Sequence, residues 1–140
     1  EEKAGNIRQT VAALDVGWLS RTRATARPPR IIWGLMEMVI HVTAGLNPAI
    51  RNPPRDTDWR SCQRMLSDAE SFHAHMALVP EWLAAGHLEG VTRASACAGL
   101  LQEELPGAWS YEAARGTSFG AACLYRYLEH LFLYAELVAK

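Results

Sequence analysis

Apolar residues recur along most of the chain at intervals of three and four residues, the spacing of amphipathic helices. The first such stripe lies near the N-terminus, with spacings of four, three and four in Ile7, Val11, Leu14 and Trp18. A second stripe near the C-terminus has spacings of four, three, four and three in Leu124, Leu128, Leu131, Ala135 and Val138. Both follow the a and d positions of a coiled coil. Two such helices at opposite ends of one chain can pair only if they run antiparallel from a common globular head.

Prolines and glycines divide the chain between these two stripes into further helices. Pro28-Pro29 should end the first helix, because the residue before a proline is biased away from the α region and a proline suits the first turn of the next helix. That next helix should begin near Pro29 and end near Gly45, before an Asn- and Pro-rich loop. Later helices are expected at 59–66, 72–85 with a break at Pro80, 88–105, and from Ser110 onward, with the long final helix over 118–139. The N-terminal helix is expected to extend over residues 7–26.

The pattern therefore predicts an all-α fold with one hydrophobic core. No sequence repeat or low-complexity segment interrupts it. We expect large side chains from several of the helices to meet in this core, namely those of Leu35, Val39, Trp59, Phe72, Leu124 and Tyr127.

Composition places the chain among globular, intracellular domains. Its 140 residues, 49% of them apolar, suit a single domain. No run of apolar residues is long enough for a transmembrane helix, and the first residues lack the pattern of a signal peptide. The cysteines, Cys62, Cys97 and Cys123, are odd in number and far apart without a CxxC pair, so we expect buried thiols without disulfide bonds.

Charge is distributed unevenly along the chain. Residues 1–64 carry ten Lys or Arg and six Asp or Glu, a net +4, whereas residues 65–140 carry four and nine, a net −5. This asymmetry indicates one basic and one acidic face, unless the two sets interleave in space. The most basic stretch, 21–30, has no aromatic residues between its arginines, so a stacking platform for nucleic acid is not supported.

No group of residues has the spacing of a catalytic or metal site. His73 and His75 are two residues apart and would not share a helix face. The adjacent Glu103-Glu104 carboxylates point apart on a helix, so an acid–base pair is not expected. The glycines of 116–120 lack the lysine and the preceding strand of a phosphate-binding loop. We therefore expect neither an enzyme nor a bound cofactor or metal.

Three groups of residues, in order, carry a resemblance to a known family. They are the double proline and helix start of 27–32; Asp58-Trp59-Arg60 with Met65-Leu66 and Phe72; and 109–112 with Ser118, Arg126-Tyr127 and Tyr134. This ordered set resembles the microtubule-binding domain at the stalk tip of dynein heavy chains. The resemblance covers nearly the whole chain, although 77–105 matches only as helix.

The resemblance implies a small bundle of about six helices on a short antiparallel coiled-coil stalk base. Residues 1–27 would be the distal ascending stalk helix, 28–117 the globular tip, and 118–140 the last tip helix continuing into the descending stalk. The family's tip grips the groove of the tubulin dimer, and its affinity is set by sliding of the stalk helices. The ATPase ring of the parent motor is absent here. Localisation would be cytoplasmic and cytoskeletal, in a cilium or flagellum.

The microtubule-binding residues that this resemblance implies are all arginines: Arg30, Arg60, Arg64, Arg115 and Arg126. Trp33 stands where the family usually has a lysine, and Gly116 where cytoplasmic forms have a basic residue. These departures favour an axonemal dynein and make Trp33 a candidate contact for a second partner. Such a partner could be the leucine-rich-repeat light chain that docks on one axonemal heavy chain.

Two other functional classes compete with the microtubule-binding module. One is a helical protein-interaction adaptor without a role at tubulin, and the other is an enzyme. Co-sedimentation with microtubules at several salt concentrations distinguishes the microtubule-binding module from the adaptor, because salt screens the charge pairs that hold an acidic filament.

Overall fold

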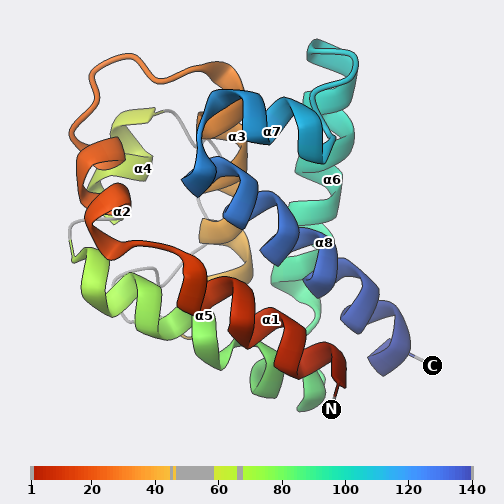
Figure 1. Ribbon diagram of the computed structural model, residues 1–140. Helices are drawn as coiled ribbons and strands as arrows, with labels where there is room; N and C mark the ends of the chain where they lie inside the picture. Colours follow the sequence, from red (N-terminus) through yellow and green to blue (C-terminus); the bar gives the residue numbers. More distant parts are fainter. Residues whose placement is uncertain (1, 45, 47–58, 66–67, 140) are drawn as a thin grey trace.

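The computed structural model describes residues 2–44, 46, 59–65 and 68–139. The described part of the chain is all-α, as the sequence predicts, and forms a helical bundle (Figure 1). Its eight helices are α1 (Glu2–Ala13), α2 (Val16–Arg23), α3 (Arg30–Thr43), α4 (Trp59–Met65), α5 (Ala69–Ala84), α6 (Glu89–Glu104), α7 (Tyr111–Thr117) and α8 (Phe119–Ala139). The two helices beyond the expected number arise from breaks near the two ends of the chain. Part of the Asn- and Pro-rich loop lies outside the described residues.

The first break lies in the N-terminal helix, where the prediction of one helix over 7–26 is wrong. α1 ends at Ala13, and Asp15 caps α2 by accepting a hydrogen bond from the Gly17 amide at 3.0 Å. An aspartate at a helix start satisfies an amide that has no helical partner, and Gly17 weakens any continuous helix here.

The second break separates α7 from α8. Ser118 has an extended backbone, with φ −173° and ψ 162°, and its Oγ accepts a hydrogen bond from the Ala121 amide at 3.1 Å. Ser118 therefore acts as the N-cap of α8. The helix predicted to run on from Ser110 is two helices, and the second begins one residue after the expected boundary at 118.

Pro80 does not break α5, contrary to the sequence-based expectation. The helix runs through it to Ala84. A proline inside a helix cannot donate to the carbonyl four residues earlier, which here belongs to Met76. The buried hydroxyl of Tyr127 donates to that carbonyl instead, at 2.8 Å. A hydrogen bond from a distant part of the chain thus replaces the missing local one.

α1 and α8 lie side by side and antiparallel, so the start of α1 and the end of α8 are at the same end of the bundle (Figure 1). The seam residues of α1 are buried, and so are the first three of α8. α1 also packs against α5, and α8 against several other helices. The two helices are therefore part of the bundle at this level, and the coiled-coil base beyond it remains a prediction.

The core is centred on α3. Met36, Met38, Val39 and Ile40 of this helix are fully buried. All six residues expected in the core are buried, with exposed fractions of at most 9%, so this prediction is confirmed. Among the described residues, no helix has both the length and the apolar character needed to cross a membrane.

Candidate functional site

α2, the 24–29 connection and α4 form one end of the bundle. It lies opposite the chain termini, where α1 begins and α8 ends (Figure 1). Two side chains of α4 hold this end together. The Trp59 indole donates to the Thr25 carbonyl at 2.7 Å. Gln63 Nε2 donates to the Arg23 carbonyl at 2.6 Å, while Arg23 Nε donates to the Gln63 carbonyl at 2.8 Å. α4 is thereby fixed against the last turn of α2.

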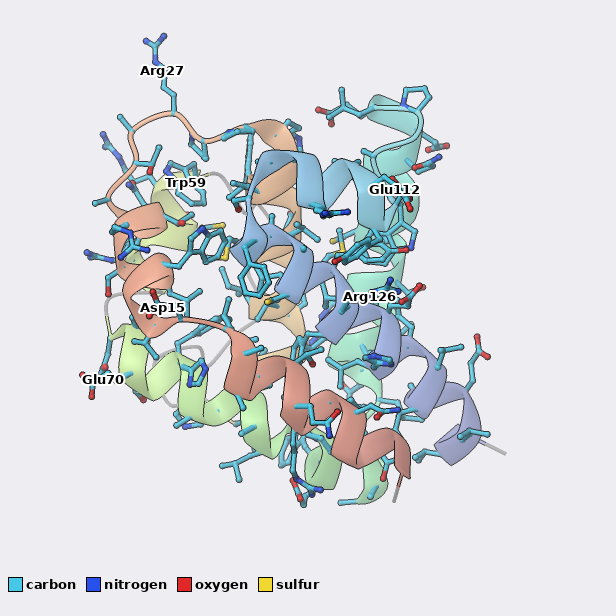
Figure 2. The ribbon with its side chains drawn as sticks, in the orientation of Figure 1. Asp15, Arg27, Trp59, Glu70, Glu112 and Arg126 are labelled. Carbon is cyan, nitrogen blue, oxygen red and sulfur yellow. The ribbon has the colours of Figure 1, made fainter. Side chains whose placement is uncertain are left out.

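This end carries several exposed arginines: Arg21, Arg27, Arg60 and Arg64. We call this end of the bundle, with these four arginines, the basic end. Arg27 points away from the bundle (Figure 2). Arg60 and Arg64 are one turn apart on α4, and Arg64 donates to Ser61 Oγ at 3.1 Å. Asp15 is the carboxylate paired with Arg21, at 3.6 Å. Arg21, Arg60 and Arg64 are thus presented to solvent from two helices that are hydrogen-bonded to one another.

Arg30, another predicted contact, is already engaged within the fold. Its Nε donates to Glu104 at 2.9 Å and its guanidinium lies 4.5 Å from the centre of the Trp33 ring. Its side chain is 27% exposed, and its Nη1 is buried without a hydrogen-bond partner. Arg30 therefore links the start of α3 to the end of α6, and Trp33 is half-buried against the core.

Arg126 is engaged in a similar way on α8. It donates to Glu129 at 2.8 Å, and its guanidinium lies 4.1 Å from the centre of the Tyr111 ring. Figure 2 shows Arg126 well separated from Trp59 and Arg27. Of the five predicted arginines, the structure brings Arg60 and Arg64 together at the basic end. Arg115 is exposed on α7.

An exposed apolar side chain lies at the start of α8, where the chain approaches α2. Phe119, the first residue of α8, is 70% exposed. The next residue, Gly120, lies so close to the Trp18 ring of α2 that a Cβ would overlap it. Phe119 is thereby held next to α2. Exposed aromatic residues are common anchors of protein–protein interfaces, and nothing in the hydrophobic pattern distinguished this phenylalanine from a core residue.

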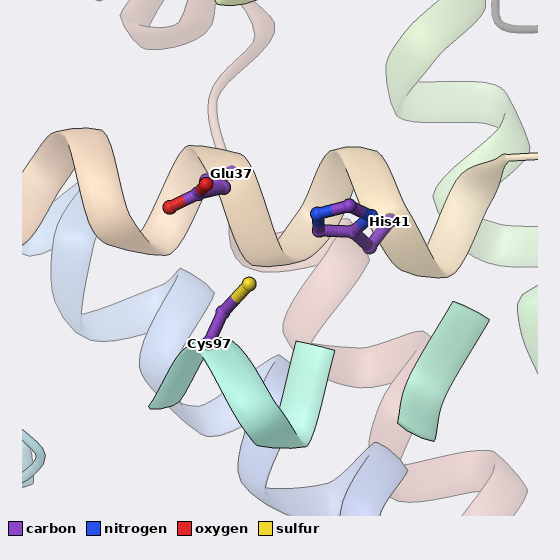
Figure 3. A group of neighbouring side chains, drawn as sticks. All are labelled: Glu37, His41 and Cys97. Carbon is purple, nitrogen blue, oxygen red and sulfur yellow. The ribbon is translucent and has the colours of Figure 1, made fainter. Parts of the chain in front are cut away.

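A group of polar side chains that sequence reasoning missed lies between α3 and α6. Glu37 and His41 are one turn apart on α3, and Cys97 of α6 faces them (Figure 3). One ligand atom from each residue lies within 4.8 Å of the others. The four-residue spacing of Glu37 and His41 was a usable signal, but nothing in the sequence placed Cys97 opposite them.

The surroundings of these three residues keep His41 and Cys97 in their neutral forms. Burial lowers the pKa of His41, and the positive charge of Arg93 lowers it further. Burial raises the pKa of the Cys97 thiol to about 11; Glu37 adds to this rise, and Arg30 opposes it. His73, by contrast, uses its Nε2 to donate to the Val11 carbonyl at 2.7 Å, so it serves packing.

The geometry thus offers two places with distinct chemistry. The basic end can attract an acidic macromolecule, and the Glu37–His41–Cys97 group has donors of the kind that bind metal ions. No protein-family model, curated protein or solved structure matches this chain.

Proposed function

We propose that this chain is the microtubule-binding tip of a dynein heavy chain, from an axonemal motor of a cilium or flagellum, and that its partner is tubulin. The observation that carries the proposal is the position of the basic end. Its exposed arginines lie opposite the end where α1 begins and α8 ends (Figure 1). A tip on a stalk needs this polarity, with the stalk helices at one end and the filament contact at the other.

The charge of the basic end suits an acidic filament. Complementary charges mainly speed association and select partners, and an exposed arginine contributes little to folding. Arg27, Arg60 and Arg64 are exposed, so they can contact tubulin without a role in stabilising the core. We assign the larger part of the contact to these residues and Arg115, because Arg30 and Arg126 already have carboxylate partners.

Phe119 adds an apolar element to this surface. Interfaces combine a desolvated apolar anchor with a polar rim. Phe119 is 70% exposed and precedes the glycine that packs on Trp18 of α2, so in this proposal it supplies the apolar anchor. The same element supports the second candidate, a helical adaptor or a tip that docks a leucine-rich-repeat light chain. Trp33 is a weaker anchor for such a partner, since its ring is half-buried under Arg30.

The antiparallel α1–α8 pair is consistent with control of microtubule affinity by sliding of two stalk helices. The paired stripes can move past one another in register steps, and a packed interface favours discrete registers over continuous ones. In this proposal a shift of α8 along α1 moves Gly120, and with it the contact to Trp18 of α2. Hydrolysis of ATP belongs to a distant part of the motor, and the tip itself is not an enzyme.

Co-sedimentation tests the proposal. The chain should pellet with microtubules at low ionic strength and be released as added salt shortens the range of its charge interactions, to about 8 Å at physiological ionic strength. Salt-insensitive pelleting, or none at low salt, would contradict it. Capture of a leucine-rich-repeat light chain without microtubule binding would favour the second candidate.

A further inference from the structure

α3 and α6 approach each other unusually closely. They run antiparallel (Figure 1), and a Cβ on Gly90 would overlap the carbonyl of His41. Farther along the pair, a Cβ on Gly34 would be 2.9 Å from a methyl group of Leu101. Small residues at such positions allow two helix backbones to come near. The short side chain of Cys97 can then reach across to α3.

Three different metal-binding groups meet at this crossing. The carboxylate of Glu37, a ring nitrogen of His41 and the Sγ of Cys97 all lie within 4.8 Å of one another. In Figure 3 the sulfur of Cys97 points toward α3, where Glu37 and His41 project from successive turns. In a tetrahedral zinc site such atoms are about 3.3–3.8 Å apart, so side-chain adjustments of about 1 Å would be enough to close the group.

A second observation concerns His41. Its side chain is only 5% exposed, yet its Nδ1 has no hydrogen-bond partner. A buried polar atom without a partner is costly in a native fold and calls for an explanation. A ring nitrogen of histidine is also a common ligand of metal ions. The fold has thus placed an unsatisfied imidazole beside a thiol and a carboxylate.

We propose that Glu37, His41 and Cys97 bind a zinc ion that clamps α3 to α6. This site goes beyond the proposed function and does not depend on it. The ligand set decides the metal, because a thiolate and an imidazole favour zinc over magnesium or calcium, which prefer oxygen ligands only. Three protein ligands leave one coordination position for water. Glu37 and Cys97 are half-exposed, which gives the ion a path from solvent.

When zinc binds, it replaces the proton of the Cys97 thiol. The S–H bond of Cys97 breaks, its proton goes to the buffer, and a zinc–sulfur bond forms without any change of oxidation state. The thiolate and the Glu37 carboxylate together neutralise the two charges of the ion. The charge of Arg30 favours the thiolate, whereas burial and the Glu37 carboxylate oppose it in the metal-free chain. Arg93 is a second positive charge that acts on His41.

Cobalt serves as a visible substitute for zinc. One equivalent of Co²⁺ added to the reduced chain should give a near-ultraviolet band from thiolate-to-cobalt charge transfer, and Zn²⁺ should abolish it. Cys97→Ala should remove the band, and Glu37→Gln should weaken zinc binding by at least about tenfold, the lower bound seen even for lost outer-shell groups. Cys123→Ala and His75→Ala, which change a thiol and an imidazole elsewhere, should keep the band.

Stability gives an independent measure. Zinc should raise the thermal midpoint of the parent chain and of Cys123→Ala, but not that of Cys97→Ala, since a ligand stabilises only the state that binds it. Circular dichroism without metal checks that each variant is folded, and Glu37→Gln reports on the site if Cys97→Ala is not. A parent chain without the cobalt band, or a band that survives Cys97→Ala or disappears in His75→Ala, would overturn the proposal.

Discussion

The hydroxyl of Tyr127 donates a 2.8 Å hydrogen bond to the Met76 carbonyl, the carbonyl that Pro80 leaves without its helical partner. Tyr127 is 1% exposed, and burial holds its pKa well above the ordinary value. The phenol therefore stays a neutral donor. α8 in this way repairs a local defect in α5, and the two helices depend on each other at this point.

Tyr127→Phe should lower the free energy of unfolding by about 1–3 kcal/mol, because a buried acceptor loses its donor. In a Pro80→Ala background the new amide at position 80 can donate to Met76, so the same substitution should cost less. Chemical denaturation of the four chains gives the coupling energy. An equal loss in both backgrounds would contradict the link between Pro80 and Tyr127.

Gly90 and Gly99 of α6 provide a test and a control for the close approach of α3 and α6. A Cβ at Gly90 would overlap the α3 backbone, whereas one at Gly99 would meet no atom within 4 Å. Gly90→Ala should destabilise the chain by about 1–3 kcal/mol, the usual cost of overpacking. Gly99→Ala should instead stabilise it by up to about 1 kcal/mol through helix propensity. Thermal melts that show the same sign for both would speak against the α3–α6 packing.

The contact between Trp18 and Gly120 should behave as a coupled pair. Gly120→Ala should cost about 1–3 kcal/mol, since the Cβ would overlap a half-buried indole. In a Trp18→Ala background the added methyl has room, so its cost should fall. Gly116→Ala, where nothing lies within 4 Å, is the control. Additive effects in urea denaturation would show that α2 does not rest on the start of α8.

Phe119→Ser should weaken microtubule binding while leaving stability within about 0.5 kcal/mol, the usual range for surface substitutions. Its side chain is 70% exposed, so little packing is lost. Leu100→Ser on α6, where the side chain is 64% exposed, is the matched control and should bind as the parent does. If microtubule pelleting falls equally for both variants, Phe119 has no specific role in the contact.

Local patterns predicted much of the fold. The apolar stripe behind Pro29 gave the position of α3, and the large side chains of Trp59 and Phe72 are in the core as expected. The break at Asp15 was harder, because a capping aspartate competes with an otherwise continuous apolar stripe. The predicted helix break at Pro80 was wrong because the Met76 carbonyl, which Pro80 leaves without a donor, is satisfied by Tyr127, 47 positions farther along the chain.

The candidate sites depend even more on tertiary contacts. The sequence identified Arg30 as a basic residue at a helix start, but its pairing with Glu104 requires the α3–α6 register. The same register brings Cys97 to His41. Arg60 and Arg64 could be grouped from sequence alone, because residues four apart share a helix face. Their position opposite the ends of α1 and α8 could not.

A charge-matched comparison at low salt tests the account most directly. Arg60→Gln with Arg64→Gln changes the net charge by −2 at the basic end. Arg8→Glu makes the same change on α1, where the exposed Arg8–Glu81 ion pair becomes an exposed pair of carboxylates. Microtubule co-sedimentation should show clearly weaker binding for the double variant and near-parent binding for Arg8→Glu, both being folded. Equal binding by the parent and the double variant, or an equal loss in both variants, would contradict a tubulin contact at the basic end.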